Sequence, residues 1–451
     1  MRVKSSVAIA DGLAARDVAA SALFSVFVEK RAFDDVFAKV SEARSLAPRD
    51  RGFARLIAAT VLRHRGSLNA VIRSFLDKPL PENQGRLEPI LLGAAAQLLF
   101  LRTPPHAAIS LAVDQCRVDS AARRFDKLAN AVLRRVSVEG DAILAELDPV
   151  TLNVPHWLLV RWQNTYGHAV AREIALASLT EAPLDLSIHG DVNAWAETLG
   201  GSVLPTGSVR LAASGRIEDL PGYDDGAWWV QDAAAALPVK LFGDVRGKHV
   251  ADLCAAPGGK TAQLAAGGAR VTSVDKSPGR LKRLKGNLAR LGLDAETAVA
   301  DASAFDPGYQ YDAVLIDAPC TATGTIRRHP DILHLKRDDD VAALAAVQAP
   351  ILARAANLVK PGGTLVYCTC SLEPEEGRDQ VAKFLAMYPE FSRSPVTPFD
   401  LVGSSSVGHD SVKSWISDEG DLRTLPHHLS DLPFGQTGMD GFFAAKLIRD
   451  A

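Results

Sequence analysis

Cysteine is scarce in this sequence, and no apolar stretch is long enough to suggest a membrane span. Five cysteines in 451 residues are an odd number and cannot form a disulfide scaffold for so long a chain. This count favours a reducing compartment, since cytoplasmic thiols stay unpaired. The longest strongly apolar runs, residues 18–28 and 90–101, fall short of the roughly 18 residues of a membrane helix. With no cleavable signal before the first run, we expect a cytoplasmic protein that does not enter a membrane.

Two common nucleotide-binding patterns are also missing. Residues 252–261, DLCAAPGGKT, follow an apolar run and are typical of a strand, a glycine-rich turn and the start of a helix. They match neither GxGxxG nor GxxxxGK followed by Ser or Thr, which disfavours NAD and ATP. Such a turn still directs N–H groups at an anion, and Asp275, at the end of ARVTSVD, is placed to bind ribose hydroxyls. The stretch predicts a nucleoside cofactor that carries a carboxylate instead of phosphates.

Neither charge sign is in large excess, because the net charge is −3. The charges are nevertheless unevenly distributed: residues 1–150 contain 22 Lys or Arg and 17 Asp or Glu, a net charge of +5, while the remainder carries −8. A basic amino-terminal region on an otherwise acidic protein would steer a polyanion to one end of the molecule. A chance imbalance between domains remains an equal alternative.

Helical spacing of apolar residues dominates the first third of the chain. It predicts an all-helical domain over residues 1–148, with one helix from an Asp50 cap to a stop at Gly66, a buried helix over 87–101 and a last helix over 123–136. Two groups of basic side chains are expected on exposed helix faces, where they would meet phosphates or simply be solvated: Arg49, Arg51, Arg55, Arg63 and Arg65, and Arg123, Arg124, Lys127, Arg134 and Arg135.

Residues 149–235 mix short helical and strand-like pieces and predict a small connecting α/β subdomain. Residues 236–451 alternate strands and helices, which indicates a mostly parallel sheet with both faces covered. The strand candidates end at five polar residues that should converge at one edge of the sheet: Cys254, Asp275, Asp301, Asp317 and Cys370. We expect DGFFAAKLIRD to form an antiparallel edge strand, and the serine-rich residues 403–411 to form a loop.

Two of these strand ends carry thiols. DAPCTATG, residues 317–324, places a carboxylate three residues before Cys320, and YCTCS supplies Cys368 and Cys370. A thiolate beside a carboxylate suits addition to an electron-poor ring: attack on carbon 6 of a pyrimidine activates carbon 5 toward an electrophilic methyl group. An unperturbed cysteine is mostly protonated at neutral pH, so a nearby Lys or cationic cofactor would have to lower its pKa.

These motifs together resemble a known family. DLCAAPGGKT, DAPCTATGTIRRHPD, KPGGTLVYCTCS and the terminal DGFFAAKL are similar, in order, to the motifs of the RNA cytosine-5 methyltransferases. LAPRDRGFARLIAATVLRHRG, PPHAAISLAVDQCR and FDKLANAVLRRV resemble the NusB-like RNA-binding domain of the bacterial Sun/Fmu group, which modifies 16S ribosomal RNA. The resemblance covers nearly the whole chain. It implies a Rossmann-like class I methyltransferase domain, S-adenosylmethionine as cofactor and 16S rRNA as substrate.

Carried over position by position, the resemblance makes Cys370 the nucleophile, Cys320 the helper in product release, and Asp317 a residue at the junction of cofactor and base. It implies that the methionine part of the cofactor lies on one continuous turn: Cys254, Ala255, Ala256, Pro257, Gly258, Gly259 and Lys260. Asp275 would bind the ribose and Asp301 the adenine end, with Arg280 as a further cofactor-binding residue. Thr321, Ala322 and Cys368 depart from the residues usual in the family, without removing a reactive group.

Other interpretations remain open. Cys116, Cys254 and Cys368 are expected to be structural, and CxC spacing makes a zinc site a poor alternative, so no metal is expected. Asp275 and Asp301 would alternatively cap helices, while His329 with Arg327 and Arg328 would contact RNA or lie in a solvated loop. The rival functions are methylation of tRNA or another rRNA site, and a non-catalytic RNA-binding or antitermination-type factor. We expect a monomer.

Overall fold

The computed structural model describes residues 12–81, 83–212, 215–403, 409–433 and 435–451. The chain divides into two compact units, one of Met1–Leu159 with His329–Lys336, the other of Val160–Arg328 with Arg337–Ala451. Residues 404–408 of the predicted serine-rich loop lie outside the described residues. The division into three domains at residues 148 and 235 stays a prediction.

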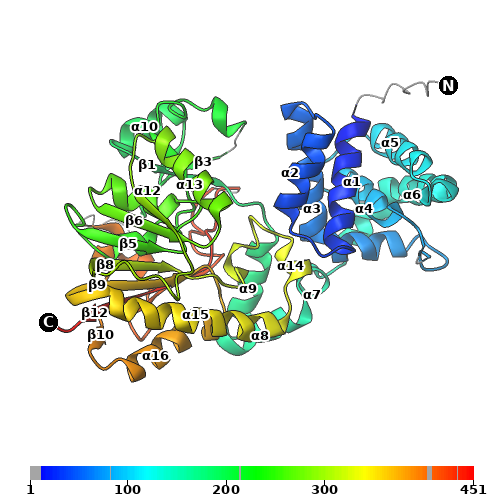
Figure 1. Ribbon diagram of the computed structural model, residues 1–451. Helices are drawn as coiled ribbons and strands as arrows, with labels where there is room; N and C mark the ends of the chain where they lie inside the picture. The colour runs from blue at the N-terminus through cyan, green and yellow to red at the C-terminus, as the bar shows by residue number, and fades with distance from the viewer. Residues whose placement is uncertain (1–11, 82, 213–214, 404–408, 434) are drawn as a thin grey trace. The chain divides into compact units, whose positions relative to one another are not determined.

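The first unit is a bundle of helices, coloured blue to blue-green in Figure 1 except for the short yellow helix from residues 329–336. Its core is continuous, and nearly every residue of its fourth helix is buried, as expected for a central helix. This confirms the predicted all-helical fold. The elements are α1 (Leu13–Phe27), α2 (Phe33–Ala43), α3 (Pro48–Arg73), α4 (Leu87–Leu99), α5 (Pro105–Val118), η1 (Ala122–Phe125), α6 (Asp126–Ala145), α7 (Pro149–Asn153) and α14 (Ile332–Leu335).

The prediction for α3 was wrong at both ends. Asp50 lies in the first turn rather than at the cap, which is Ala47, because Pro48 already begins the helix. The helix also continues through Gly66, with a local kink at His64. A Cβ on Gly66 would lie 1.8 Å from the Leu152 backbone oxygen, so this glycine allows α7 to pack closely and does not end the helix.

The second unit begins with helices and a small antiparallel sheet in the order β2-β3-β1-β4. A buried ion pair, Arg210 Nε to Asp185 Oδ1 at 2.6 Å, lies within this sheet. Arg210 also donates to the carbonyl of Gly438, at 2.7 Å, which ties the small sheet to the carboxyl-terminal segment. The elements are α8 (His156–Tyr166), α9 (His168–Ser178), β1 (Leu184–Ile188), α10 (Val192–Leu199), β2 (Ser202–Val203), β3 (Val209–Leu211), η2 (Ile217–Asp219) and β4 (Trp228–Val230).

The main sheet follows, with strands in the order β10-β12-β9-β8-β5-β6-β7. Strands β9, β8, β5, β6 and β7 are parallel, whereas β10, β11 and β12 pair antiparallel. The elements are α11 (Leu237–Lys240), β5 (His249–Leu253), α12 (Gly259–Ala266), β6 (Arg270–Asp275), α13 (Pro278–Arg290), β7 (Glu296–Val299), β8 (Tyr311–Asp317), η3 (Thr323–Thr325), α15 (Asp338–Leu358), β9 (Val359–Thr369), η4 (Pro374–Glu376), α16 (Arg378–Met387), β10 (Phe391–Arg393), α17 (Pro398–Val402), α18 (His409–Lys413), β11 (Leu422–Thr424) and β12 (Phe442–Arg449).

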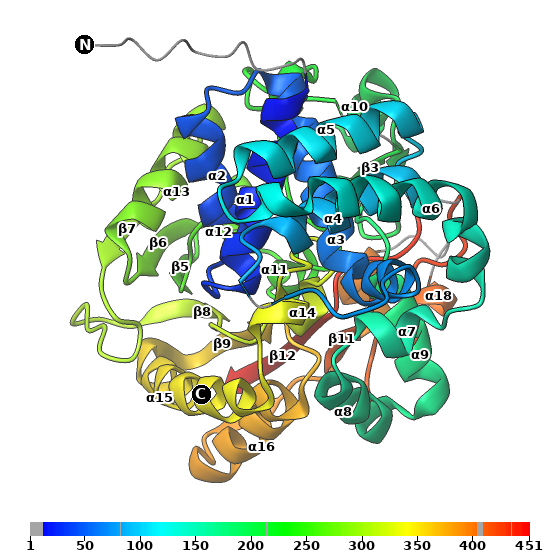
Figure 2. The ribbon, with the colours of Figure 1, turned by 90° about the vertical axis from the view of Figure 1, so that its right-hand side faces the viewer.

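Helices cover both faces of this sheet, as Figures 1 and 2 show. Side chains alternate along each strand: Val314 and Ile316 of β8 face a core shared with α15 and α16, while Ala313 and Leu315 face one shared with α11 and α12. The buried strands are therefore apolar on both faces, which is typical of parallel sheets. The fold is the predicted Rossmann-like α/β arrangement with a mostly parallel sheet.

One sheet prediction was wrong. The terminal strand β12 is antiparallel as expected, but it lies inside the sheet, between β9 and β10. The outer strand β10 has only three residues, FSR, too short to give an alternating apolar pattern in the sequence.

One described helix, α15, is long and apolar enough to cross a membrane by length and composition. Its apolar residues are mostly alanine, and Gln348, Pro350 and Arg354 interrupt them, so the sequence shows no long strongly apolar run here. In the fold it packs against β8, β9 and α16, and it buries Ile351, Leu352 and Ala355 in the core of the sheet. Its packing is that of a helix covering one face of the sheet.

Candidate active site

The glycine turn joins β5 to α12 at the carboxyl edge of the sheet. Cys254 has a φ of 63° and Gly258 a φ of 105°, so both adopt left-handed conformations that close the turn tightly. A Cβ on Gly258 would lie 2.8 Å from Leu284 Cγ, which leaves room only for glycine. The first N–H groups of α12 have no acceptor within their own helix and are directed beyond the sheet edge. The turn can therefore hold a carboxylate.

Two of the predicted cofactor residues, Asp275 and Arg280, lie on either side of this turn. Asp275 is buried and accepts hydrogen bonds from the N–H groups of Ala256, at 3.3 Å, and Ser277, at 2.9 Å. Arg280 forms an ion pair with Asp275 at 3.3 Å and donates to the Ala256 carbonyl. The Asp275 carboxylate thus holds both the glycine turn and Ser277, the residue that caps α13. Its predicted role toward a ribose stays a prediction.

Asp301 lies two residues beyond β7 and is exposed. Its carboxylate accepts from the N–H of Ser303 at 2.9 Å and from the Ser303 hydroxyl at 2.6 Å. These hydrogen bonds lower the pKa of Asp301, so the group is charged at neutral pH. It combines a local turn-capping contact with an accessible negative charge.

Lys260 and Asp317 connect the turn to the next strand. Lys260 Nζ donates to Asp317 Oδ2 at 2.8 Å and lies 4.7 Å from the centre of the Phe442 ring. Burial lowers the pKa of Lys260, but the Asp317 carboxylate outweighs this effect and the net shift is upward, so the amine is charged. Asp317 Oδ1 also accepts from Cys368 Sγ at 3.7 Å. Asp317 remains partly exposed and is available to a ligand.

The two proposed reactive thiols lie together, with Cys320 Sγ 3.4 Å from Cys370 Sγ. A hydrogen bond with Cys320 and then burial raise the pKa of Cys370 well above its ordinary value. Lys260 opposes this shift, but its charge is already balanced by Asp317. The protein by itself therefore keeps Cys370 as a thiol. Of the two activators that the sequence suggested, a lysine does not fit this geometry, and activation by a cationic cofactor stays a prediction.

The remaining cysteines are structural in character. Burial raises the pKa of Cys254 to about 12, and its side chain packs against the core of the sheet. Burial likewise raises the pKa of Cys116 to about 12, and that of Cys368 well above its ordinary value. All five cysteines are free. Within the described ranges, no group of three or more His, Cys, Asp or Glu side chains is arranged to hold a metal ion.

Close backbone contacts hold the Cys320 and Cys370 turns against each other. The N–H of Gly324 donates to the Cys370 carbonyl at 3.0 Å, and the N–H of Gly441 donates to the Gly324 carbonyl at 2.8 Å. A Cβ on Gly324 would lie 2.0 Å from the Gly441 oxygen. The start of β12 thus packs directly on the turn that follows Cys320.

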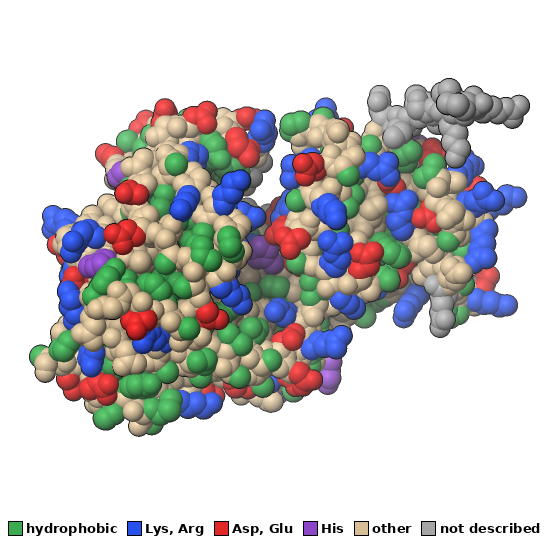
Figure 3. All heavy atoms as spheres, in the orientation of Figure 1, with side chains coloured by type: hydrophobic (Ala, Val, Ile, Leu, Met, Phe, Trp, Pro, Cys, Tyr) green, Lys and Arg blue, Asp and Glu red, His purple; other side chains and the backbone are tan. Residues whose placement is uncertain are grey.

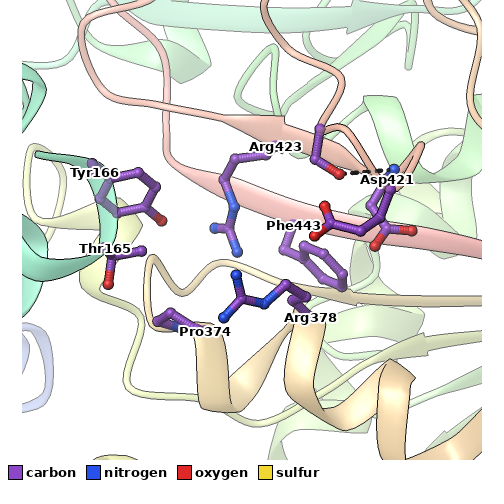
Figure 4. Close-up of a pocket in the computed structure, with 9 residues that line it drawn as sticks. Thr165, Tyr166, Pro374, Arg378, Asp421, Arg423 and Phe443 are labelled. Carbon is purple, nitrogen blue, oxygen red and sulfur yellow. Dashed lines mark hydrogen bonds between the residues drawn. The ribbon is translucent and has the colours of Figure 1, made fainter.

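Sequence reasoning missed a set of polar residues behind the thiols. Arg423 of β11 donates to the Ser371 carbonyl at 2.6 Å and lies over the Phe443 ring. It lines a small pocket of about 140 Å³ in the second unit, where its guanidinium points toward that of Arg378 (Figure 4). Glu376 contacts the residues that follow both cysteines. Single buried polar residues of this kind leave no periodic or motif signal in a sequence.

The arginines of RRHPD are structural. Arg327 is buried and donates to the carbonyls of Glu181 and Thr437, while Arg328 pairs with Asp232 at 2.5 Å and Asp440 at 3.2 Å. The suggested RNA contact by these two arginines is therefore wrong, because their donors are engaged inside the second unit. His329 pairs with Asp34 in the first unit at 3.3 Å.

The two predicted basic faces differ. On α3, Arg63 is buried, contrary to expectation, and Arg55 and Arg65 form ion pairs with Asp34 and Glu88. The second group is exposed throughout, on η1 and α6: Arg123, Arg124, Lys127, Arg134 and Arg135. Figure 3 shows many Lys and Arg side chains on the visible face of the helical unit, with acidic side chains between them.

Comparison with known proteins agrees with this geometry. Residues 13–138 match the NusB family, and residues 241–448 match the family described as 16S rRNA methyltransferase RsmB/F. The chain is 34% identical, over 452 residues, to ribosomal RNA small subunit methyltransferase B of Cronobacter sakazakii, covering 96% of this chain and 98% of that relative.

Two solved structures are similar. The crystal structure of PH0851 has a TM-score of 0.70 at 22% identity, covering 99% of this chain and 100% of that one, and shows a likeness of fold. A methyltransferase homolog protein from Pyrococcus horikoshii has a TM-score of 0.51 at 26% identity, covering 64% of this chain and 93% of that one.

The parallel sheet, its antiparallel terminal strand and the glycine turn at its carboxyl edge define a Rossmann-like methyltransferase. With its amino-terminal NusB domain and an identity that extends over nearly its full length, the chain belongs to the 16S rRNA methyltransferase RsmB/F family. The predicted family and class of enzyme are thereby confirmed.

Proposed function

We propose that this enzyme transfers a methyl group from S-adenosylmethionine to carbon 5 of one cytosine in 16S rRNA, through a covalent bond between Cys370 and the base. The observation that carries the proposal is the pair of thiols 3.4 Å apart beside Asp317 and the glycine turn. A pyrimidine that reaches this edge of the sheet meets a nucleophile, a second thiol and a carboxylate at once.

The residues of the turn fit the cofactor. The N–H groups at the start of α12 suit its methionine carboxylate, and Asp275 suits its ribose hydroxyls. Asp301 is an accessible acceptor for an adenine amino group, and Arg280 holds Asp275 in place. When bound, the cofactor supplies an electrophilic methyl group and a positive charge on sulfur.

In the proposed reaction the Cys370 thiolate adds to carbon 6 of cytosine, and carbon 5 becomes nucleophilic and accepts the methyl group. The proton on carbon 5 then leaves, the bond between sulfur and carbon 6 breaks, and the Cys370 sulfur departs with the electron pair. Cys320 lies against that sulfur and assists the release step as a proton donor or acceptor. Asp317 would hydrogen-bond the edge of the base while it holds Lys260.

The target cytosine has to be unpaired or drawn out of its stack, because base chemistry of this kind cannot occur inside a duplex. The name of the matched family and those of its relatives favour 16S rRNA over tRNA. The exposed basic side chains of η1 and α6 would supply phosphate contacts. The proposal also includes a monomer in the cytoplasm, with the three domains 1–148, 149–235 and 236–451.

The direct test is the substitution Cys370→Ala. It should abolish methyl transfer to 16S rRNA, because the proposal assigns the attack on carbon 6 to Cys370 and only the release step to Cys320. Bisulfite sequencing of rRNA from cells with and without the protein would identify the cytosine. A normal rate of methylation in the C370A variant would refute the assignment of Cys370 as the nucleophile. A protein-dependent 5-methylcytosine found in tRNA and not in 16S rRNA would refute the proposed substrate.

A second variant separates the two thiols. Cys320→Ala should still allow attack but slow release, so that a covalent protein–RNA adduct accumulates. The adduct would migrate slowly on a denaturing gel and disappear in the double variant that also lacks Cys370. The absence of any adduct in C320A, under conditions where the natural protein turns over, would contradict the release role.

A further inference from the structure

A hydroxyl residue directly follows each of the two reactive cysteines. Thr321 comes after Cys320, and Ser371 comes after Cys370. Both hydroxyls donate to the same atom, Glu376 Oε2, each at 2.5 Å. The N–H of Thr321 donates to the other oxygen, Oε1, at 2.9 Å. One carboxylate therefore joins two turns whose residues Thr321 and Ser371 lie 50 residues apart in the chain.

Gln348 of α15 extends this connection to the other side of Cys320. Its Nε2 donates to Glu376 Oε1 at 3.1 Å and to the Pro319 carbonyl at 2.9 Å. The Tyr367 hydroxyl donates to the backbone oxygen of Glu376 at 2.7 Å and contacts Gln348 Oε1 at 3.1 Å. The residues before and after Cys320, and the residue after Cys370, are thus all held by one buried network.

A buried glutamate such as Glu376 is unusual where hydrogen bonds serve only to hold the structure together. Its side chain is fully buried, and no Lys or Arg in the described part of the chain forms an ion pair with it. Burial raises the pKa of Glu376, while the hydrogen bonds from Ser371 and Thr321 oppose the shift. A buried carboxylate is costly unless several donors surround it, so neutral residues would hold the same turns at lower cost.

An ionised carboxylate can accept more hydrogen bonds than a neutral amide or hydroxyl side chain. It accepts four hydrogen bonds at once on two oxygens, here from Thr321, Ser371 and Gln348. Charged hydrogen bonds are short and geometrically strict, so they fix their donors closely. Since two of the donors are neighbours of the two thiols, these hydrogen bonds act together with the backbone contact between Gly324 and Cys370 in setting the distance between the sulfur atoms.

We propose that Glu376 is a positioning residue, whose carboxylate holds the Cys320 and Cys370 turns in register so that both thiols face one bound base. This inference rests on the proposed function, because it assigns Cys320 and Cys370 their successive roles. Glu376 itself contacts neither thiol and takes no part in proton transfer.

The test uses two sets of variants in the full-length protein. Glu376→Gln keeps the shape of the side chain but provides one acceptor oxygen in place of two. Thr321→Val keeps the shape of Thr321 and removes its hydroxyl, while Thr321→Ser keeps the hydroxyl. Glu373→Gln is the control for loss of a buried carboxylate: Glu373 is bound by Arg161 and Trp162 of α8, and its side-chain contact with the Cys320 turn, from the Thr323 hydroxyl at 3.3 Å, is longer than any hydrogen bond to the Glu376 carboxylate.

Two quantities are measured for each variant. The first is kcat and KM for RNA methylation. The second needs neither RNA nor cofactor: it is the rate at which the oxidant diamide converts Cys320 and Cys370 to a disulfide, followed by peptide mass mapping. We expect E376Q and T321V to lower kcat about tenfold or more with KM changed less than about threefold, since small misplacements of reacting groups have effects of this size. The disulfide rate should fall in parallel.

T321S should recover most of both losses, and E373Q should change the disulfide rate far less than E376Q. An unchanged kcat in T321V, or a lowered kcat with an unchanged disulfide rate, would overturn the proposal, as would a T321S variant as defective as T321V. If E376Q does not fold, the matched pair at Thr321 decides the question. Should the natural protein methylate no RNA at all, the proposed function fails, whereas the disulfide rates still report whether Glu376 sets the thiol positions.

Discussion

At the scale of single residues, the charge state of Cys370 governs the proposed chemistry. Its pKa is raised by the hydrogen bond with Cys320 and by burial, and Lys260, the cation that opposes this shift, is paired with Asp317. A sulfonium ion bound above the turn would add an unpaired positive charge and favour the thiolate. The protein would then expose a reactive thiolate only when the methyl donor is present.

This argument predicts how Cys370 reacts with iodoacetamide. In the free protein, alkylation should be slow at pH 7 and rise about tenfold per pH unit up to pH 9, because only the thiolate reacts. At pH 7.5, S-adenosylmethionine should accelerate alkylation relative to S-adenosylhomocysteine, which has nearly the same shape and no charge on sulfur. Mass mapping of the Cys370 peptide, with C370A as a blank, measures the rates. Equal rates with the two ligands would contradict the electrostatic argument.

The buried Asp252, in β5, leads to a second prediction, which concerns how the stability of the protein depends on pH. Burial raises its pKa to about 7, against the effect of the hydrogen bond from Thr261. In the unfolded chain an aspartate titrates near 3.9, so between pH ~4 and ~7 the folded protein holds a proton that the unfolded chain has lost. The contribution of Asp252 to the free energy of unfolding is therefore fully present below about pH 4 and is lost as the pH rises toward 7.

The substitution Asp252→Asn removes this dependence and keeps an acceptor for Thr261. The D252N variant should be more stable than the natural protein at pH 8 by up to about 4 kcal/mol, at 1.36 kcal/mol per pKa unit, and this advantage should shrink to about 1.5 kcal/mol at pH 5. Free energies of unfolding in urea at the two pH values measure the difference. A variant that is less stable by the same amount at both pH values would argue against a buried, titrating Asp252.

Residue types at the site were predictable from the sequence, whereas their partners were not. The predicted strand ends singled out Asp317 and Cys370, and the resemblance to the family assigned roles to Cys320 and Cys370. The neutralisation of Lys260 by Asp317, and the use of Arg327 and Arg328 as internal donors, depend on contacts across more than fifty residues of sequence. No periodic pattern encodes such long-range pairs.

At the scale of elements, one close contact links the carboxyl-terminal strand to the active site. Gly324 follows Cys320 in the turn η3, and its Cα faces the backbone of Gly441 where β12 begins. A side chain here would collide with backbone atoms, which cannot rotate away. The start of β12 and the Cys320 turn would then have to separate.

We therefore predict that Gly324→Ala destabilises the protein by about 1–3 kcal/mol and lowers kcat about tenfold or more, because the displaced turn carries Cys320. The matched control is Gly286→Ala, in the exposed face of α13, where a Cβ would meet no neighbour within 4 Å. The free energy of unfolding of this control should rise by about 0.5–1 kcal/mol, because alanine has a higher helix propensity than glycine. Thermal unfolding and methylation assays measure both. Equal behaviour of the two variants would show that the β12 contact has no role.

Elements with strong periodicity were predicted well, and those defined by tertiary contacts were not. The strands β5, β6, β8 and β9 end within a few residues of their predicted ends, since buried parallel strands are long apolar runs. The end of α3 was missed because Gly66 serves helix packing, and the place of β12 was missed because β10 has only three residues. Packing partners and short edge strands are decided by the assembled fold.

At the scale of the whole molecule, the uneven charge of the sequence corresponds to a difference between the basic faces of the helical unit. On α3, Arg55 and Arg65 form ion pairs and Arg63 is buried, whereas all five basic residues of η1 and α6 are exposed and, of these, Arg135 pairs with Glu139. Lys127 and Arg134 are seven residues apart, two helical turns, and thus share one face of α6. This face provides positive charge for a phosphate backbone without breaking an internal ion pair.

If this face contacts RNA, the double substitution Lys127→Ala and Arg134→Ala should weaken binding and reduce its dependence on salt. Each lost contact to a single-stranded phosphate lowers the slope of log K against log salt by about 0.7, so the double variant should lose about 1.4. Cofactor binding, measured by calorimetry, should be unchanged because the cofactor residues lie in the other unit. The control is the exposed pair Arg246 and Asp244, whose joint replacement by Ala leaves the net charge unaltered. Filter binding at several salt concentrations measures the slopes, and an unchanged slope in K127A/R134A would place the RNA contacts elsewhere on the molecule.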